Sequence, residues 1–280
     1  MKKHRKHLIV AVSVMTVVSS FAQCENDADE IAARIAVECK NVRRDKFFGF
    51  DRTSFEFHGH QAWVVSPKGK SLPGSPWTWT MQWATSFVPR TSVPQLLVDG
   101  YHHVTIDTFQ HRMDETGLKV SCEFQKFLVE KLGFAKKVDL VGLSWGGFFA
   151  VRYANRYPEN VSHLYLDGPL MSFQRFACPS PWHAMPPADG DWSKDPRMPI
   201  TMGPSLAKAN IPILLLYGGQ DQTCIPSANC EPFIKAFQDA GGVIKVIKRD
   251  AYGHHPHGVE PGEPTIRFFF EDRDGTVKKR

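Results

Sequence analysis

One short glycine-rich segment carries the residue best suited to nucleophilic chemistry. Ser144 stands in the centre of the stretch 142–147, which reads GLSWGG. The apolar run 137–141 before it is typical of a buried strand, and the run 148–154 after it is typical of a buried helix. This is the nucleophile-elbow pattern G-x-S-x-G, in which glycines let the strand and the helix approach closely. A chain of this length contains the pattern by chance about one time in ten, so other residues must support it.

A serine hydroxyl becomes a useful nucleophile only when a base lies within hydrogen-bond reach and a carboxylate orients that base. Asp221 follows the apolar run 213–217 and the short segment Gly-Gly-Gln, so we expect it in the loop after a core strand. That is where an orienting carboxylate is required, and Asp221 is the predicted acid. Asp167 also ends an expected strand and is the alternative.

The base is expected after the last strand, in the segment 251–258, which reads AYGHHPHG. His254 is preferred because it follows a glycine, the usual form for this loop, and His255 and His257 are the alternatives. A His-His-Pro-His segment is also able to bind a metal ion. No Cys-x-x-Cys pair or carboxylate cluster lies near it in the sequence, so neither a metal nor another cofactor is expected.

An acyl-transfer site also needs two backbone N–H groups for the oxyanion. One is expected from Trp145, which follows the nucleophile and begins a helix. The second is expected at the end of the third strand, at Trp79 or Thr80. The pair His58-Gly59 looks like a familiar oxyanion sequence, but it comes one strand pair too early in the chain.

Apolar runs alternate with helical patterns through most of the chain, which predicts an α/β fold. We expect a mostly parallel central sheet with helices on both faces. Strands are expected within 47–58 and at 62–65, 77–80, 103–107, 138–142, 161–167, 211–217 and 243–247. Helices are expected before Gly100, at 121–132, from the elbow to 156, at 231–240 and at 264–271. Residues 25–45 are expected to form a surface segment.

Residues 168–209 interrupt this alternation with eight prolines and no clear period. We interpret them as a lid insertion over one edge of the fold. Several tryptophans are expected near the loops that would line the site. Of these, Trp77 and Trp182 are the predicted substrate-binding residues, because aromatic faces suit sugar rings.

The amino terminus has the organisation of a signal peptide. Residues 1–7 are basic, residues 8–18 are apolar, and Ser20-Phe21-Ala22 has the small-x-small form of a cleavage site. We therefore expect a signal peptide at 1–22, a mature domain at 23–280 and a secreted or periplasmic protein. Four of the five net positive charges lie within the first six residues, so the mature part has a net charge of about +1. That balance favours neither nucleic acid nor an anionic membrane as partner.

Six cysteines lie beyond the signal peptide, and an even number in an exported chain permits disulfides. Cys224 and Cys230 bracket one loop and are the pair expected first. Cys24 and Cys39 are the second expected pair.

Three segments together resemble the α/β-hydrolase superfamily: GLSWGG at 142–147, GGQD at 218–221 with Pro226 beyond it, and GHHPHG at 253–258. The resemblance extends over roughly residues 53–272. Further segments, PWTW at 76–79, DGP at 167–169 and HHPH at 254–257, resemble a group of exported bacterial α/β hydrolases associated with polysaccharide breakdown and regarded as esterases. The chain departs from the usual pattern in lacking a His-Gly pair after the third strand.

The resemblance implies a serine hydrolase that cleaves carboxylic esters through an acyl-enzyme. Ser144 would attack, His254 would act as base, and Asp221 would orient the imidazole. The expected partner is a small-molecule or oligosaccharide ester, and the expected reaction is deacylation of an acylated carbohydrate. A serine peptidase and a non-catalytic exported binding protein on the same fold are the alternatives.

Overall fold

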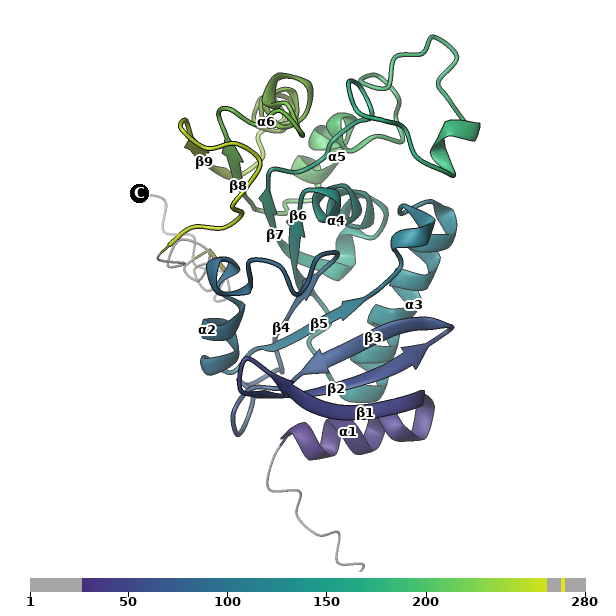
Figure 1. Ribbon diagram of the computed structural model, residues 1–280, viewed down its shortest axis with the longest axis vertical. Helices are drawn as coiled ribbons and strands as arrows, with labels where there is room; N and C mark the ends of the chain where they lie inside the picture. Colours follow the sequence, from purple (N-terminus) through teal and green to yellow (C-terminus); the bar gives the residue numbers. More distant parts are fainter. Residues whose placement is uncertain (1–26, 261–267, 270–280) are drawn as a thin grey trace, which may run out of the picture.

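The structure is a computed structural model that describes residues 27–260 and 268–269 of the 280-residue chain (Figure 1). The expected signal peptide, Cys24 and most of the expected helix at 264–271 lie outside the described residues. Phe268 and Phe269 are helical and buried. Within the described part of the chain, no helix has both the length and the apolar character that a membrane span requires.

The centre of the molecule is a nine-stranded sheet in the order β1-β2-β3-β5-β4-β6-β7-β8-β9. The four strands β1, β2, β3 and β5 pair antiparallel, and all pairings from β5 through β4 to β9 are parallel. The predicted mostly parallel sheet is therefore confirmed. The strands are β1 (Lys40–Phe47), β2 (Phe50–Phe57), β3 (His60–Val65), β4 (Trp77–Thr80), β5 (His102–Ile106), β6 (Val138–Leu143), β7 (Val161–Asp167), β8 (Ile213–Gly218) and β9 (Ile244–Arg249).

Helices cover both faces of the sheet because the central strands are apolar on both sides. On β8, Leu215 packs into the larger core and Leu214 into the smaller core on the opposite face. The larger core takes residues from α1, α3, α4, α5 and α6, and the smaller one includes Leu96 of α2. Figure 1 shows α2 apart from α3 and α4. The helices are α1 (Asp27–Glu38), α2 (Val93–Val98), α3 (Glu115–Leu132), α4 (Trp145–Arg156), α5 (Gly203–Lys208) and α6 (Cys230–Asp239).

One strand departs from the sequence prediction. Residues 25–45 were expected as a charged surface segment with a modest helical period, and they contain α1 and also most of β1, which was not expected. The sequence of β1 is KNVRRDKF, and most of its side chains are exposed at the edge of the sheet. An exposed edge strand lacks the alternation of apolar and polar residues that identifies a half-buried strand, and charged edges are common because they prevent unwanted pairing.

The segment 168–209 runs from β7 to just before β8 and contains two short 3₁₀ turns and α5. Its first part packs beside the elbow, since the rings of Phe173 and Phe176 both lie 5.8 Å from the Trp145 ring. A buried carboxylate, Asp195, accepts hydrogen bonds from the backbone and side chain of Arg197. Two further contacts hold the segment to the rest of the protein: the Met171 N–H donates to Asn229 Oδ1 and the Trp182 indole donates to the Arg112 carbonyl, both at 2.9 Å.

The predicted disulfide between Cys224 and Cys230 is wrong, because both thiols are free. The thiol of Cys230 points back along its own chain segment and contacts the carbonyl oxygen of Pro226 at 3.9 Å. Burial raises the pKa of both thiols, which keeps them protonated and unreactive. The second expected pair involves Cys24, which lies outside the described residues.

Candidate active site

Ser144 lies at the turn between β6 and α4, in a backbone conformation that few residues adopt. Its φ of 52° and ψ of −116° are strained for a residue with a side chain. The turn closes because Gly142 and Gly147 have no side chains. A Cβ on Gly142 would lie 2.8 Å from the carbonyl oxygen of Gly146, and one on Gly147 would lie 2.3 Å from Pro169. The local sequence therefore forces the Ser144 hydroxyl out at the carboxyl edge of the sheet.

Three side chains from three separate loops meet at this edge. His254 Nε2 lies 3.0 Å from Ser144 Oγ, and His254 Nδ1 lies 2.7 Å from Asp221 Oδ2. A carboxylate accepts but does not donate, so Nδ1 carries the proton and Nε2 is left as the acceptor for the hydroxyl proton. Asp221 is 1% exposed, whereas Ser144 and His254 are half-buried. This arrangement is able to activate the hydroxyl as a nucleophile.

Asp221 is fixed by the turn that follows β8. Its Oδ1 accepts hydrogen bonds from the backbone N–H groups of Thr223 and Cys224, both at 2.8 Å. Burial by itself raises the pKa of this carboxyl, but the hydrogen bonds and the adjacent His254 outweigh it and lower the pKa below its ordinary value. The carboxylate is therefore ionised at neutral pH and holds one tautomer of the imidazole.

The histidine loop is pressed against the loop that carries Asp221. A Cβ on Gly218 would lie 2.2 Å from the carbonyl oxygen of Gly253, so only glycine permits this contact. Two arginines hold the far side of the loop. Arg90 donates to the His257 carbonyl at 2.8 Å, and Arg249 donates to the Pro256 carbonyl at 2.9 Å. The two arginines therefore hold the backbone of the loop, and the His254 ring is left to contact Asp221.

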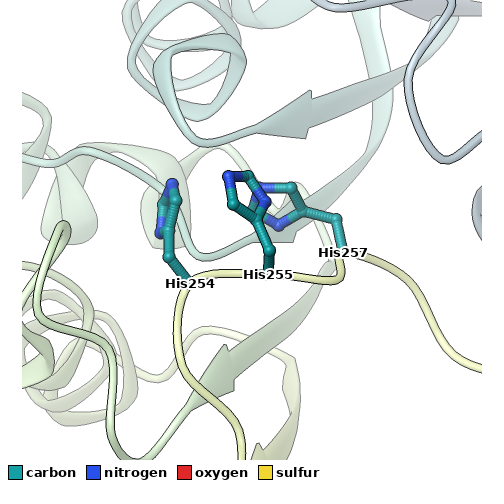
Figure 2. A group of neighbouring side chains, drawn as sticks. All are labelled: His254, His255 and His257. Atoms are coloured by element: carbon teal, nitrogen blue, oxygen red, sulfur yellow. The ribbon is translucent and has the colours of Figure 1, made fainter.

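The alternative acid and one alternative base form a second buried pair. Asp167 Oδ1 lies 3.2 Å from Nδ1 of His257 and 2.9 Å from an Arg249 guanidinium nitrogen, and Oδ2 accepts from the Gly258 N–H. Asp167 is fully buried and His257 is 2% exposed. Figure 2 shows that the rings of His254, His255 and His257 rise from the same side of the loop.

The residues expected to supply oxyanion donors, Trp145 and Trp79 or Thr80, differ in whether their backbone N–H groups are free. Trp145 is the first residue of α4, so its N–H has no acceptor within the helix. Trp79 and Thr80 do not provide the second donor. They lie inside β4 between β5 and β6, where the parallel ladders use the backbone.

The loop directly after β4 contains free backbone N–H groups that no sequence pattern indicates. Within the described part of the chain, the backbone N–H groups of Gln82 and Trp83 have no acceptor, and neither does the buried Nε2 of Gln82. A Cβ on Gly146 would lie 3.4 Å from the Gln82 nitrogen, so this loop lies against the elbow. This loop lacks the His-Gly pair that usually identifies an oxyanion loop, so the sequence did not indicate its role.

Neither tryptophan predicted to bind substrate is available to do so. Trp77 is fully buried and donates from its indole nitrogen to the Ala135 carbonyl. Trp182 is 2% exposed and donates to the Arg112 carbonyl. Both indoles are satisfied core residues, which corrects the prediction. The pair His58-Gly59 forms the turn of the hairpin between β2 and β3 and has no part in the site.

A different set of aromatic side chains gathers at Trp145, the residue that follows the nucleophile. The Trp83 ring lies 5.0 Å from that of Phe109, and Phe109 lies 5.8 Å from the ring of Trp145. The Arg112 guanidinium lies 3.6 Å from the centre of the Phe109 ring. Trp83 is 41% exposed, and the other two rings are partly exposed. We name Trp83, Phe109 and Trp145 the aromatic wall.

Comparison with known proteins agrees with this architecture. Residues 73–198 match the model of a family described as having the alpha/beta hydrolase fold. No curated protein matches the chain by sequence. The family match, the sheet topology and the elbow after β6 together show that the chain has the α/β-hydrolase fold.

Similar solved structures include peptidases and a smaller hydrolase. Dipeptidyl peptidase 4 of Porphyromonas gingivalis is 13% identical, with a TM-score of 0.59 over 87% of this chain and 37% of its own. The acylaminoacyl peptidase of Pyrococcus horikoshii is 14% identical, with a TM-score of 0.55 over 89% of this chain and 44% of its own. A predicted CIB-like hydrolase from Thermoplasma acidophilum is 12% identical, with a TM-score of 0.51 over 84% and 99%. At these identities the comparisons establish the fold, and the chain spans less than half the length of both peptidases.

Proposed function

We propose that the chain is a serine hydrolase that cleaves carboxylic esters. The observation that carries the proposal is the pair of contacts made by His254, with Nε2 3.0 Å from Ser144 Oγ and Nδ1 2.7 Å from Asp221 Oδ2. Ser144 attacks the ester carbonyl while His254 takes its proton, and His254 then protonates the leaving alcohol. Water activated by the same imidazole releases the acid and restores the hydroxyl.

The tetrahedral intermediates need an oxyanion site, which we assign to two chain segments. The Trp145 N–H lies at the amino end of α4, where the helix dipole adds positive potential. The loop Met81–Trp83 supplies the second donor from a backbone N–H of Gln82 or Trp83. Donors of this kind stabilise the developing negative charge by about 3 kcal/mol each.

We infer that the substrate is an ester of a carbohydrate. The aromatic wall supports this inference, since flat aromatic faces pack well against the apolar faces of sugar rings. The indoles of Trp83 and Trp145 take the role that the sequence assigned to Trp77 and Trp182. We further propose that the protein acts after export and cleavage of residues 1–22, as the basic and apolar amino-terminal segments suggest. Mass spectrometry of the exported protein, with an expected amino terminus near Gln23, tests this.

The experiment for the nucleophile is labelling with a fluorophosphonate probe. We expect the wild-type protein to be labelled and Ser144→Ala to remain unlabelled, while Ser172→Ala, which changes a buried serine in the neighbouring lid segment, keeps its label. Unchanged labelling of Ser144→Ala would contradict the assignment. No labelling of any form would favour the non-catalytic alternative.

The second candidate function is that of a serine peptidase. It is favoured by the folds named above, since two of the similar structures are peptidases. Release of p-nitrophenol from the acetate ester without cleavage of peptide p-nitroanilides would support the esterase. Cleavage of anilides at a comparable kcat/KM would support the peptidase. A panel of acetylated and feruloylated oligosaccharides beside short-chain lipid esters then tests the alcohol part of the substrate.

A further inference from the structure

Three imidazoles gather at one point of the proposed active site, although its mechanism needs only one. Figure 2 shows the rings of His254, His255 and His257 side by side above their loop. One ring nitrogen from each lies within 4.8 Å of the ring nitrogens of the other two, and the ring centres are 4.8–4.9 Å apart. With metal–nitrogen distances of about 2.1 Å, a tetrahedral ion holds its ligand nitrogens about 3.4 Å apart, so binding to all three side chains would draw the rings together by about 1 Å.

Two of these imidazoles are oriented in the manner of metal ligands. Metal-binding histidines commonly donate their second N–H to a carboxylate, which fixes the tautomer and raises the basicity of the ligand nitrogen. His254 has this arrangement with Asp221 and His257 has it with Asp167, through Nδ1 in both cases. The supporting carboxylates are far from the histidines in the sequence, which is why the sequence alone does not indicate a metal site.

Two of the three imidazoles have ring nitrogens that other described residues do not use. His257 Nε2 is buried and has no hydrogen-bond partner among the described residues. A buried polar atom without a partner is costly and calls for an explanation. The His255 ring is exposed and stacks on Phe87 at 5.4 Å, and it makes no hydrogen bond within the described part of the chain.

The charges around the cluster favour a cation. Two buried carboxylates, Asp167 and Asp221, lie beside the imidazoles, and the Arg249 guanidinium pairs with Asp167 at 2.9 Å. The second nearby guanidinium, that of Arg90, pairs with Glu260 at 3.0 Å. The balance of these fixed charges is negative, so a divalent ion bound to neutral imidazoles is partly neutralised by the carboxylates in contact with its ligands.

We propose that His254, His255 and His257 form a binding site for Zn²⁺ or a similar divalent transition-metal ion that inhibits the enzyme. Three imidazoles and one water complete the tetrahedral coordination that Zn²⁺ prefers. An ion at this site takes the His254 imidazole out of catalysis, because Nε2 is the proposed base and Nδ1 is held by Asp221. The inhibitory part of this proposal rests on the proposed function, whereas the binding part does not.

The binding test is isothermal titration of the metal-free protein with ZnCl₂, using Ser144→Ala beside the wild type. Both forms keep all three imidazoles, so we expect one ion per chain in both. His255→Ala is expected to weaken Zn²⁺ binding at least tenfold, and His257→Gln to weaken it in the same direction. His183→Ala, which removes an exposed histidine elsewhere, is the matched control and is expected to bind like the wild type. Replacement of Zn²⁺ by Co²⁺ is expected to produce the intense visible bands of a tetrahedral site, and His255→Ala to diminish them.

The inhibition test uses hydrolysis of p-nitrophenyl acetate. Zn²⁺ is expected to abolish turnover in the concentration range where it binds, and a chelator is expected to restore it. His255→Ala is expected to turn over normally without Zn²⁺ and to need at least tenfold more Zn²⁺ for inhibition. Absence of binding, or binding that His255→Ala and His257→Gln leave unchanged, would overturn the site. Full turnover at saturating Zn²⁺, or turnover that requires Zn²⁺, would overturn the inhibition. Binding to the cluster in a protein without hydrolase activity would overturn the proposed function and leave the metal site standing.

Discussion

Asp167 and His257 form a buried pair that contacts the proposed catalytic pair through a single glycine. The contact joins Asp167 Oδ1 to His257 Nδ1 at 3.2 Å. Gly168, the residue after Asp167, separates the two pairs: a Cβ placed there would lie 3.2 Å from His257 Cε1 and 3.4 Å from His254 Nδ1. The loop after β7 therefore supports the histidine loop from behind, and several measurable consequences follow from this arrangement.

Asp167→Asn is expected to destabilise the protein. The carboxylate is fully buried and pairs with Arg249, which is 9% exposed, so the substitution leaves a buried guanidinium without its counter-charge. Breaking such a pair costs about 3 kcal/mol. Urea unfolding measures the change. Asp51→Asn is the control, since Asp51 pairs with Lys46 at the surface and its loss should cost under about 1 kcal/mol. Equal effects of the two variants would show that the Asp167 pair contributes no more than a surface contact.

Asp221→Asn is expected to reduce kcat by a factor of about 10⁴, because an amide no longer holds the productive tautomer of His254. Asp167→Asn is expected to reduce kcat far less, by about tenfold, through the displaced histidine loop. Steady-state kinetics with p-nitrophenyl acetate compares the two variants. The reverse order of effects would identify Asp167 as the acid.

Gly142→Ala is expected to lower kcat/KM about 100-fold without changing any reacting group. The added methyl would lie 2.8 Å from Gly146 O and from Gly147 Cα, so the elbow must shift. Displacements of about 1 Å at a catalytic group have effects of this size. Gly253→Ala is the matched control, since the nearest atom to its methyl is the Gln220 oxygen at 3.9 Å. Full activity of Gly142→Ala would mean that the tight turn is unnecessary for catalysis.

Trp83→Ala is expected to raise KM about tenfold for esters of oligosaccharides and to leave kcat for p-nitrophenyl acetate nearly unchanged, because it removes part of the aromatic wall. Its side chain is 41% exposed, so the free energy of unfolding should change little. Phe48→Ala removes an exposed ring on the β1–β2 turn and serves as the control. An unchanged KM for every carbohydrate ester would exclude the wall from substrate binding.

The protein is expected to lose stability as the pH falls below about 6.5. Burial lowers the pKa of His102 to about 4 and that of His103 to about 3, so both imidazoles are neutral in the folded state at pH 5 and protonated in the unfolded state. The unfolded state then binds more protons, and each histidine costs about 1 kcal/mol of stability per pH unit.

The variant His102→Phe tests this dependence, because the new ring retains the stack on Phe134 at 4.4 Å and the Nδ1 atom that it replaces has no partner among the described residues. Urea unfolding between pH 6 and pH 4.5 gives the free energy of unfolding at each pH. This free energy is expected to fall less steeply with pH in the variant, by the amount that corresponds to one bound proton. The exposed His183→Phe should leave the slope unchanged. A slope unaltered by His102→Phe would mean that this imidazole is protonated in the folded state as well.

The positions of most elements were predictable from the sequence because their signals are local. The apolar runs of β6, β7 and β8 are continuous, and the strand–turn–helix pattern around Ser144 occupies adjacent residues. The edge strand β1 was not predictable, since its charged side chains face solvent and leave no apolar pattern. The tryptophans were placed wrongly because proximity to a site in sequence does not determine which face of a strand or turn carries a side chain.

The sequence by itself determined the candidate nucleophile and the order of Ser144, Asp221 and His254, since glycines and apolar runs specify where each strand ends. Only the tertiary structure decided which histidine meets which aspartate. Three histidines stand within four positions, and their neighbours in space come from β7, β8 and the turn at Arg90. Hydrogen bonds between loops distant in the chain select His254 for Asp221 and His257 for Asp167, and no local pattern records that choice.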